Sequence, residues 1–272
     1  MIGDNVKVGI QDIACFAKYG VLNFAFEAGA WFRTMNPHDK KFSHIRRFRN
    51  RFRGKRCFIC ATGPSLNVDD LEKIKGEYCF GVNSICEVYS LTEWRPDFYV
   101  FQDYPILEHY GDDIDKGHTK IFIGTPLVND KGGKKISSKW IKFPLNCYYQ
   151  MFDFKVLNNA KIYFSSNSYI EVYGGFTVTY SAIQLAVYMG FNEIYLLGVD
   201  CNYKPGTNNH FRKMKNEFRR TAMMSNGERE LQIKAYKVAK VEARKRGCTI
   251  INVSRGGELD VFPRQKLEDI FA

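Results

Sequence analysis

The sequence predicts an α/β protein with a mostly parallel sheet and helices on both faces. Short apolar runs alternate along the chain with longer segments of helical spacing, which is typical of a parallel sheet. Polar residues follow most of the apolar runs directly, at the position where open α/β sheets bind their ligands. A length of 272 residues with 45% hydrophobic content is enough for a sizeable core, which excludes disorder as the main state.

Seven strands and two long helices are expected after residue 55. The apolar runs predict strands over 57–61, 78–83, 98–103, 120–124, 139–143, 193–200 and 249–254. The mainly apolar segment 177–189 predicts one helix, and the charged segment 228–246 predicts another because small and apolar residues recur along one of its faces. We expect a domain of residues 55–272 that contains the sheet, preceded by a separate segment of residues 1–54.

The N-terminal segment combines an apolar-faced helix with a basic stretch. Apolar residues recur at helical spacing over 10–34, and ten Lys and Arg residues against one acid, Asp39, lie between Arg33 and Arg56. This order resembles a monotopic membrane anchor, so an anionic membrane surface is an expected partner of residues 10–56. The alternative is a helix packed on the main domain with a solvated basic linker. Nucleic acid is not expected, because no recognition module accompanies the charge.

The sequence also predicts where the protein is located and whether its cysteines are reduced. No apolar run reaches the roughly 18 residues of a spanning helix, and the N-terminus lacks the order of a secretion signal. We therefore expect a cytoplasmic protein, peripheral at the inner face of the cell membrane.

The eight cysteines are scattered, which predicts reduced core thiols. Cys57 and Cys60 are three apart in a strand and point to opposite faces, so they are poorly placed to share a zinc ion.

Two glycine-containing turns are expected to hold phosphates. Residues 62–65, Thr-Gly-Pro-Ser, lie between the first strand and a helical run that opens at Asp69, and free amides at a helix start attract phosphate. A plain strand-to-helix connection is the alternative. The second turn, residues 173–179, also precedes a helix and supplies hydroxyls. Together they predict a diphosphate or nucleoside phosphate held from two sides.

The predicted nucleotide-binding residues belong to these turns and to the remaining strand ends. They are Thr62, Gly63, Pro64, Ser65, Asn83, Asp103, Gly175, Thr177, Val178, Thr179, Asp200, Tyr203, Ser254 and Arg255.

Four ordered motifs resemble a known family. ATGPSL after the first strand, FGVNSI near 80–85, the block GGFTVTYSAIQLAVYMGFNEIYLLGVDCNY at 174–203 and INVSRGGELDVFPR at 251–264 resemble the 6-hydroxymethylpterin diphosphokinase MptE-like family. More distantly, they are similar to the bacterial sialyltransferases of the Campylobacter type. The resemblance covers roughly residues 55–265. It implies a Rossmann-like fold, with a metal-independent nucleotide-sugar site in the glycosyltransferase branches and diphosphate transfer from ATP in the pterin branch.

The resemblance also implies roles for individual residues. Asn83 falls where the sialyltransferases have a nucleotide-contacting Asn, and Asp103 falls where they have a second Asn. Residues 177–179 match their Thr-Ser-Gly turn, here Thr-Val-Thr, and Asp200 matches the Asp that closes the following strand. The family's base, a His shortly before the last long helix, is absent, and Asn226 and Glu228 stand there instead.

The catalytic base is expected at one of two places. His210 lies in the 203–212 loop, which follows the strand ending at Asp200 and can reach a donor. Glu228 or Glu230 is the competing base, and a surface role for His210 is the alternative. Positive charge for the leaving phosphates is available without a metal from basic residues of the last third: Arg212, Lys213, Arg219, Arg220 and Arg255.

The expected function is a glycosyltransferase of cell-surface polysaccharide or glycoconjugate biosynthesis. It would take a sugar from a nucleotide donor, with a CMP-linked sugar as one candidate, to a saccharide or lipid-linked acceptor, with no cofactor and no metal. A metal could instead bind at the triplet Asp113-Ile114-Asp115, placed in an acidic loop and superficially like the D-x-D of metal-dependent enzymes. A diphosphokinase that acts on a pterin-like alcohol and a nucleotide-binding protein without catalysis are the competing functions.

Overall fold

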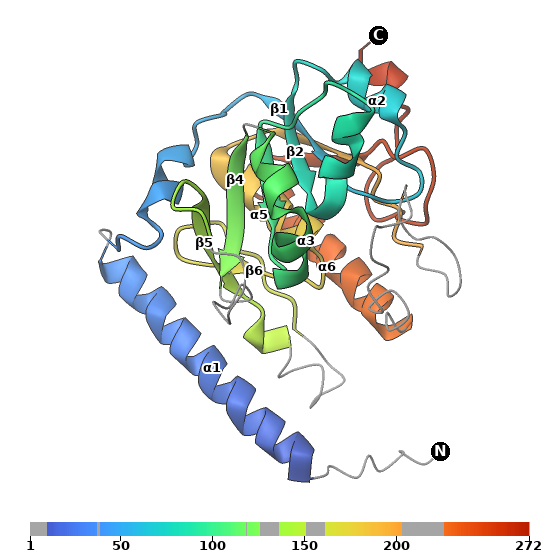
Figure 1. Cartoon of the computed structure of the whole chain (residues 1–272). Coiled ribbons are helices and arrows are strands. Elements are labelled where there is room, and N and C mark those ends of the chain that lie inside the picture. Colours follow the sequence, from blue (N-terminus) through green and yellow to red (C-terminus); the bar gives the residue numbers. More distant parts are fainter. Residues whose placement is uncertain are drawn as a thin grey trace, which may run out of the picture.

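The computed structural model describes residues 10–36, 39–117, 119–125, 136–150, 161–202, 211 and 226–271. Within these residues, one eight-stranded sheet has the order β6-β5-β4-β3-β2-β1-β7-β8, and all its strand pairs are parallel. The strands are β1 (Arg56–Cys60), β2 (Tyr78–Val82), β3 (Phe98–Phe101), β4 (Lys120–Thr125), β5 (Ile141–Asn146), β6 (Val172–Tyr173), β7 (Glu193–Leu197) and β8 (Thr249–Asn252). Figure 1 shows the strands of this sheet among the helices that pack on it, and the predicted Rossmann-like α/β class is confirmed.

Helices cover both faces of the sheet, as predicted. The α-helices are α1 (Ile10–Met35), α2 (Val68–Lys73), α3 (Tyr104–Asp115), α5 (Val178–Met189) and α6 (Asn226–Arg244), and the 3-10 helices are η1 (Ser43–Phe48), η2 (Asn83–Ser90) and η4 (Glu268–Ile270). Side chains of α5, α6 and η1 share one hydrophobic cluster, whereas those of α2, η2 and α3 share the other. Cys57 belongs to the first cluster and Cys60 to the second, so the two thiols lie on opposite faces. The seven cysteines with described side chains are free and buried, which confirms core packing.

Three segments differ from the expected elements. The strand expected at 139–143 begins at Ile141 and runs to Asn146, because Trp140 belongs to the preceding turn. The two-residue strand β6 is too short to leave an apolar run. The acidic triplet at 113–115 lies in the last turn of α3 and not in a loop, since Pro105 lies in the first turn of this helix and Ile106, Tyr110 and Ile114 bury one face of it at helical spacing.

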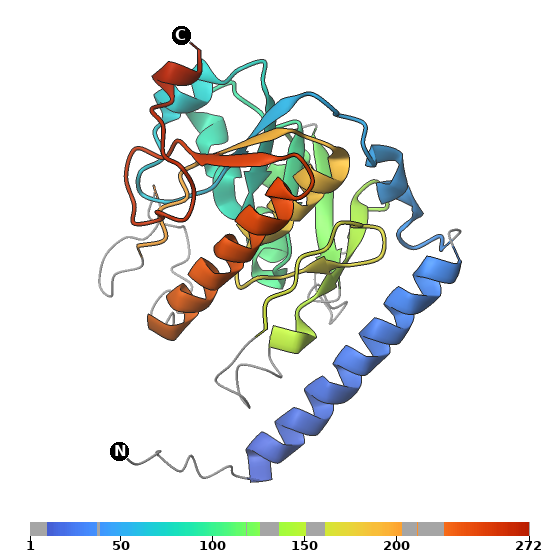
Figure 2. The same cartoon turned by 180° about the vertical axis from the view of Figure 1, so that it is seen from behind.

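The basic stretch is packed on the sheet through its aromatic residues. Ile45 and Phe48 of η1 are fully or almost fully buried, and the ring of Phe48 contacts Phe98 and Phe122 edge-on. The amide of Asn50 donates to the carbonyl of Tyr188 in α5 (3.0 Å). The predicted boundary between residues 54 and 55 remains a prediction, but side chains before it contribute to the core of the α/β domain. Figures 1 and 2 show α1 along one side of this domain, extending beyond it.

One buried amide side chain joins α5 to the strand that precedes it. Gln184 of α5 is fully buried, and its Oε1 accepts from the amides of Ser165 (2.9 Å) and Tyr173 (3.1 Å). Its Nε2 donates to the carbonyls of Tyr173 (2.7 Å) and Tyr180 (3.2 Å). Since every residue of α5 is buried, this network fixes the helix that connects β6 to β7.

We predict that Gln184→Leu lowers the free energy of unfolding by about 2–4 kcal/mol, because two amides and one carbonyl lose their partners in a dry interior. Equilibrium urea denaturation followed by circular dichroism measures this. Gln265→Leu is the matched control: Gln265 is exposed, so the change should stay within about 0.5 kcal/mol. Equal stability of the two variants would contradict the role given to Gln184.

Candidate functional site

The candidate site lies where the strand order of the sheet reverses. The chain proceeds from β1 outward to β6 and then returns through α5 to β7, which pairs with the other side of β1. Doubly wound α/β proteins bind ligands outside the carboxyl ends of the strands at this switch point. Here a cavity of about 80 Å³ is lined by the ends of β1, β2 and β7, the first turn of α5 and one face of α6. That volume holds a few water molecules or a phosphate-sized group.

Half of the predicted nucleotide-binding residues meet at this cavity. They are Thr62, Gly63, Asn83, Thr177, Val178, Thr179 and Asp200. Pro64, Ser65, Asp103, Gly175, Ser254 and Arg255 are not among its lining residues. Tyr203, His210 and the side chain of Glu228 lie outside the described residues, as do Arg212, Lys213, Arg219 and Arg220.

Eight lining residues were not among the predicted ones, and four of them have polar side chains: Cys201, Asn202, Gln232 and Tyr236. The first two directly follow Asp200. Gln232 is 2% exposed and lies on the same face of α6 as Ala235, Tyr236 and Ala239. A polar residue on an otherwise apolar helix face was the available signal for it.

The turn at 62–65 binds Asp200 instead of presenting free amides. The amide of Gly63 donates to the carbonyl of Gly198 (2.9 Å), and the amide of Ser65 donates to Oδ2 of Asp200 (2.7 Å). The Ser65 hydroxyl donates to the other oxygen of the same carboxylate. In α2, the side chain of Asn67 caps the amide of Asp69 (3.1 Å). The expectation of free amides at this turn is therefore wrong, because the chain itself occupies the amides of Gly63 and Ser65.

The turn at 173–179, in contrast, leaves a helix start open to the cavity. Thr177 is the N-cap of α5, and its hydroxyl accepts from the amide of Thr179 (3.3 Å). The amide of Val178 has no acceptor among the described residues, and the side chains of Thr177 and Val178 line the cavity. Because α5 has twelve residues and points its N-terminus at the cavity, its dipole and free amide favour an anion there.

A second unpaired group faces the same space. Asn83, at the carboxyl end of β2, has φ of 50°, and its Oδ1 is buried without a partner in the described part of the chain. The hydroxyl of the buried Tyr99 donates to the Asn83 carbonyl and accepts from the amide of Cys86 (3.2 Å), which holds the turn in place. A buried amide oxygen without a hydrogen-bond donor destabilises the fold, unless a ligand or a water molecule supplies the donor.

Strained backbone gathers around the cavity. Among the described residues, four residues other than glycine have positive φ. Two of them, Asn83 (50°) and Cys201 (54°), line the cavity, and a third, Phe176 (63°), directly precedes the lining residue Thr177. Gln232 of α6 holds two of these turns, since its Nε2 donates to the Phe176 carbonyl (3.2 Å) and its Oε1 accepts from the Cys201 thiol (3.8 Å). Strain of this kind persists where the surroundings determine the conformation, commonly at functional sites.

The cavity carries a negative charge that is already hydrogen-bonded. Asp200 is 4% exposed, and its carbonyl accepts from the amide of Glu258 (2.7 Å). Burial raises the pKa of the neighbouring Cys201 to about 11, so this thiol is protonated at neutral pH and is a poor nucleophile. The site thus combines a fixed carboxylate, an open helix start and neutral hydrogen-bonding groups, an arrangement that can bind a nucleotide phosphate and a hydroxyl-bearing group side by side.

The comparison with protein families identifies the chain. The model described as 6-hydroxymethylpterin diphosphokinase MptE-like matches residues 33–206. The chain belongs to this MptE-like family. The match begins in α1 and includes every strand end that lines the cavity, whereas α6 lies beyond it.

This MptE-like protein has low similarity to solved structures and matches no curated protein. Among solved structures, it is similar to the MAf glycosyltransferase from Magnetospirillum magneticum AMB-1, with 18% identity and a TM-score of 0.48. The alignment covers 85% of this chain and 38% of that one, so the chain spans well under half of its neighbour's length.

The remaining predicted residues of the MptE-like chain support the site from outside. A side chain on Gly175 (φ 56°) would collide with the ring of Tyr180 at 2.1 Å, so this glycine is required by packing. The Ser254 hydroxyl accepts from the amide of Val199 (3.0 Å) at the end of β7. Asp103 is the residue before α3 and lies near Cys147, whose pKa is raised mainly by burial.

The D-x-D carboxylates have separate partners. Asp113 binds Lys116 (2.9 Å), whereas Asp115 accepts from the Trp140 indole (3.0 Å). In the described part of the chain, no group of three or more His, Cys, Asp or Glu residues is arranged to hold a metal ion.

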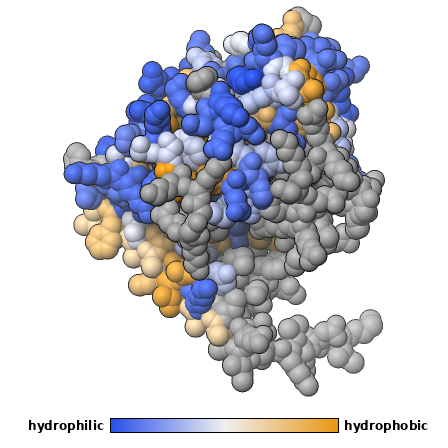
Figure 3. Space-filling view, viewed as in Figure 1, coloured by the Kyte–Doolittle hydropathy of each residue, from blue (hydrophilic) through white to orange (hydrophobic). Residues whose placement is uncertain are grey.

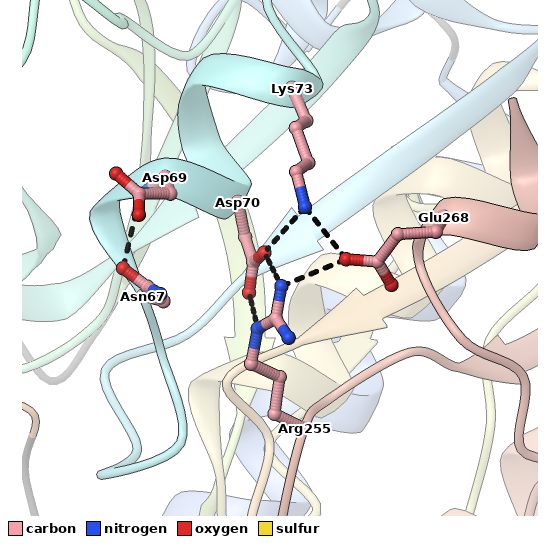
Figure 4. Close-up of polar contacts among 6 residues, drawn as sticks. All are labelled: Asn67, Asp69, Asp70, Lys73, Arg255 and Glu268. Atoms are coloured by element: carbon pink, nitrogen blue, oxygen red, sulfur yellow. Dashed lines mark hydrogen bonds and ion pairs between the residues drawn. The ribbon is translucent and has the colours of Figure 1, made fainter.

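Arg255 belongs to an ion-pair network with residues of α2 and η4 that do not line the cavity. Its Nε donates to Oδ2 of Asp70 (2.7 Å), which is fully buried in α2, and its Nη2 donates to Glu268 (3.0 Å) (Figure 4). Lys73 also binds Glu268 (2.7 Å) and holds the pKa of that carboxyl at about 2. Hydrogen bonding to Asp70 raises the pKa of Arg255. The guanidinium therefore joins the C-terminal segment to α2.

We predict that Arg255→Met lowers the free energy of unfolding by about 1–3 kcal/mol, because the buried Asp70 carboxylate loses its main partner. The loss is smaller than for a fully buried pair, since the Arg255 side chain is 44% exposed. Chemical denaturation measures it, and Arg244→Met, an exposed position on α6, is the control. If Arg255 bound phosphate instead, the variant would keep its stability and lose nucleotide affinity.

Proposed function

We propose that the chain is a transferase that binds a nucleotide at the switch point, with the phosphates at the N-terminus of α5. The observation that carries this proposal is the convergence of two groups unsatisfied within the described chain, the Val178 amide and Asn83 Oδ1, on one cavity at the carboxyl ends of parallel strands. Phosphate oxygens accept from the Val178 amide at the helix start and from the Thr62 and Thr177 hydroxyls. Asn83 Oδ1 accepts a hydrogen bond from the nucleoside.

The leading reaction is glycosyl transfer from a nucleotide-sugar donor, with a CMP-linked sugar as one candidate, to a saccharide or lipid-linked acceptor. Support comes from the resemblance of Asn83, the 177–179 turn and Asp200 to residues of the sialyltransferases. As the donor bond breaks, negative charge develops on the leaving phosphate, where the dipole of α5 stabilises it. Like charges repel, so the Asp200 carboxylate faces hydroxyls of the sugar or nucleoside and not the phosphates. His210 and Glu228 remain the proposed bases.

The second candidate is diphosphate transfer from ATP to a pterin-like alcohol, and the description of the family favours it. The same helix start would then bind the phosphates of ATP. A screen of CMP, UDP, their sugar conjugates and ATP by thermal unfolding separates the two reactions. A ligand at about 100 times its Kd adds about 2.7 kcal/mol of stability, which raises the Tm of a chain of this size by about 5–10 °C.

We predict that CMP or UDP raises the Tm and that ATP does not. Asn83→Gly should reduce this shift by about half by weakening affinity about tenfold, while the unliganded protein keeps its stability because glycine adopts positive φ freely. Asn50→Gly is a matched control, since Asn50 also has positive φ (56°) but does not line the cavity. A shift with ATP alone would favour the diphosphokinase. Nucleotide binding without nucleotide release on addition of acceptors would indicate a binding protein without catalysis.

We further propose that no metal takes part, and we predict full nucleotide release in EDTA. The dipole of α5 and basic side chains such as Arg212 and Arg219 then replace a metal cation at the leaving phosphates. The measurement is the rate of release in EDTA against the rate in Mg²⁺, with Asp113→Asn as a check on metal binding at the D-x-D triplet. Loss of activity in EDTA that Mg²⁺ restores would contradict metal independence.

A further inference from the structure

The outer face of α1 exposes a stripe of large apolar side chains. Val21, Phe24, Trp31, Phe32 and Met35 are 57–75% exposed, and their spacing places them on one side of the helix. We call these five residues the α1 stripe. Figure 3 shows the hydrophobic colouring gathered over α1, directly beside a strongly hydrophilic region. Contiguous exposed apolar surface of this kind marks an interaction site.

The opposite face of α1 is fixed to the domain. Asn146, at the end of β5, donates through Nδ2 to Glu27 (3.0 Å) and Asn23 (3.3 Å). Ala30 is 4% exposed, and Arg33 donates through Nε to the carbonyl of Ile170 (2.8 Å). These contacts lie on the side of the helix away from the α1 stripe, so the stripe cannot rotate toward the core. The stripe faces outward in the described structure, so only a surface outside the domain can cover it.

A cleft lined by four arginines adjoins the C-terminal end of the stripe. Arg33 of α1 and Arg46, Arg47 and Arg49 of the η1 region line a space of about 630 Å³, together with hydroxyl groups that include that of Tyr169. Among the described residues, no acidic side chain lines this space. Arg46 also rests on the Tyr169 ring at 5.3 Å. We call this space the arginine cleft, and its described lining residues are all different from those of the switch-point cavity.

Arg33 gives the cleft an unsatisfied buried donor. The residue is 9% exposed, and its Nη2 is buried with no hydrogen-bond partner within the described chain. Burial lowers the pKa of Arg33, and the nearby Asp39, Glu171 and Glu27 oppose this shift. A buried guanidinium with a free N–H is a strong site for a phosphate oxygen.

We propose that the α1 stripe and the arginine cleft together form a docking site for an anionic phospholipid surface. The stripe enters the interface between head groups and acyl chains, and the cleft takes the phosphate of one lipid. Lys40, Lys41, Arg51 and Arg53 are exposed beside it, and no acidic side chain of the described residues forms an ion pair with them. A free phosphate would satisfy the cleft but leave the stripe uncovered. An anionic lipid surface covers the stripe with acyl chains and supplies phosphate oxygens to the cleft at the same time.

This inference does not depend on the proposed function, because the docking site and the switch-point cavity are built from different residues of the described chain. Residues 10–35 form no membrane-crossing span, since no helix of the described chain is long and apolar enough for one. The helix would lie in the plane of the interface.

Co-sedimentation of the full chain with vesicles tests the proposal. Binding should be at least tenfold tighter to phosphatidylcholine vesicles that contain about 30 mol% phosphatidylglycerol than to pure phosphatidylcholine, and it should weaken with salt. The variants Phe24→Ser with Trp31→Ser, and Arg47→Glu with Arg49→Glu, should each lose about tenfold or more in affinity. Thermal melts without vesicles confirm that both variants fold.

Matched controls use exposed residues away from α1. Leu91→Ser with Val241→Ser removes exposed apolar side chains elsewhere, and Lys234→Glu with Lys237→Glu makes the same change in net charge on α6. Both should bind the anionic vesicles like the unaltered chain. Equal losses in the controls and in the α1 or η1 variants would overturn the proposal.

Tryptophan fluorescence gives an independent readout. Trp31 is 57% exposed, whereas Trp94 and Trp140 are 1% and 9% exposed, so a blue shift on vesicle addition would come from Trp31. Trp31→Phe should keep vesicle binding and lose the shift. Binding without any blue shift in the unaltered chain would contradict insertion of the stripe.

Two results would assign the surface to another occupant and overturn the lipid proposal. Stabilisation by soluble glycerol phosphate without any vesicle binding would identify a site for free phosphate. A dimer in sedimentation velocity that Phe24→Ser with Trp31→Ser converts to monomer, again without vesicle binding, would identify a second copy on the stripe.

Discussion

The candidate site depends on the parallel pairing of β1 with β7. The pairing continues past the strands, because the amides of Ala61 and Gly63 donate to the carbonyls of Leu197 (2.8 Å) and Gly198 (2.9 Å). The chains approach so closely that a Cβ on Gly63 would lie 2.5 Å from the Gly198 carbonyl. This contact brings the Ser65 amide to the Asp200 carboxylate and leaves a narrow cavity between the strand ends. Without β7 beside β1, the residues that line the cavity would not meet.

The rest of the site combines rigid support with unsatisfied groups. α5 is wholly buried and fixed by Gln184, so its open N-terminus is aimed at the cavity by the core. α6 supports the opposite wall, where Gln232 and Arg229 hold the turns at Phe176 and Cys201. Strained turns cost stability, and a buried core of this size can support them. Unsatisfied groups on a rigid frame are a suitable basis for binding charge without reorganisation.

The two proposed surfaces are related through α1. Asn146 lies at the carboxyl end of β5, and its contacts place the middle of α1 beside the same edge of the sheet that carries the switch-point cavity. Docking of the α1 stripe on a membrane would therefore hold this edge close to the lipid surface. The proposed lipid-linked acceptor would then meet the proposed nucleotide site without leaving the membrane.

The sequence by itself determined the class of fold and most strand positions, and half of the residues that it predicted for the site line the cavity, because buried parallel strands leave apolar runs and polar residues such as Asn83 and Asp200 end them. It also located the apolar helix and the arginines of the basic stretch. Only the tertiary structure decided which groups remain free. Free amides were expected at 62–65, yet the Gly198 carbonyl takes the Gly63 amide and Asp200, 135 residues away from Ser65, takes the Ser65 amide, while the start of α5 stays open. Arg255 was expected near phosphates, yet buried Asp70 binds it. Sequence shows which donors and acceptors exist, but whether each is satisfied depends on long-range contacts that no local pattern records.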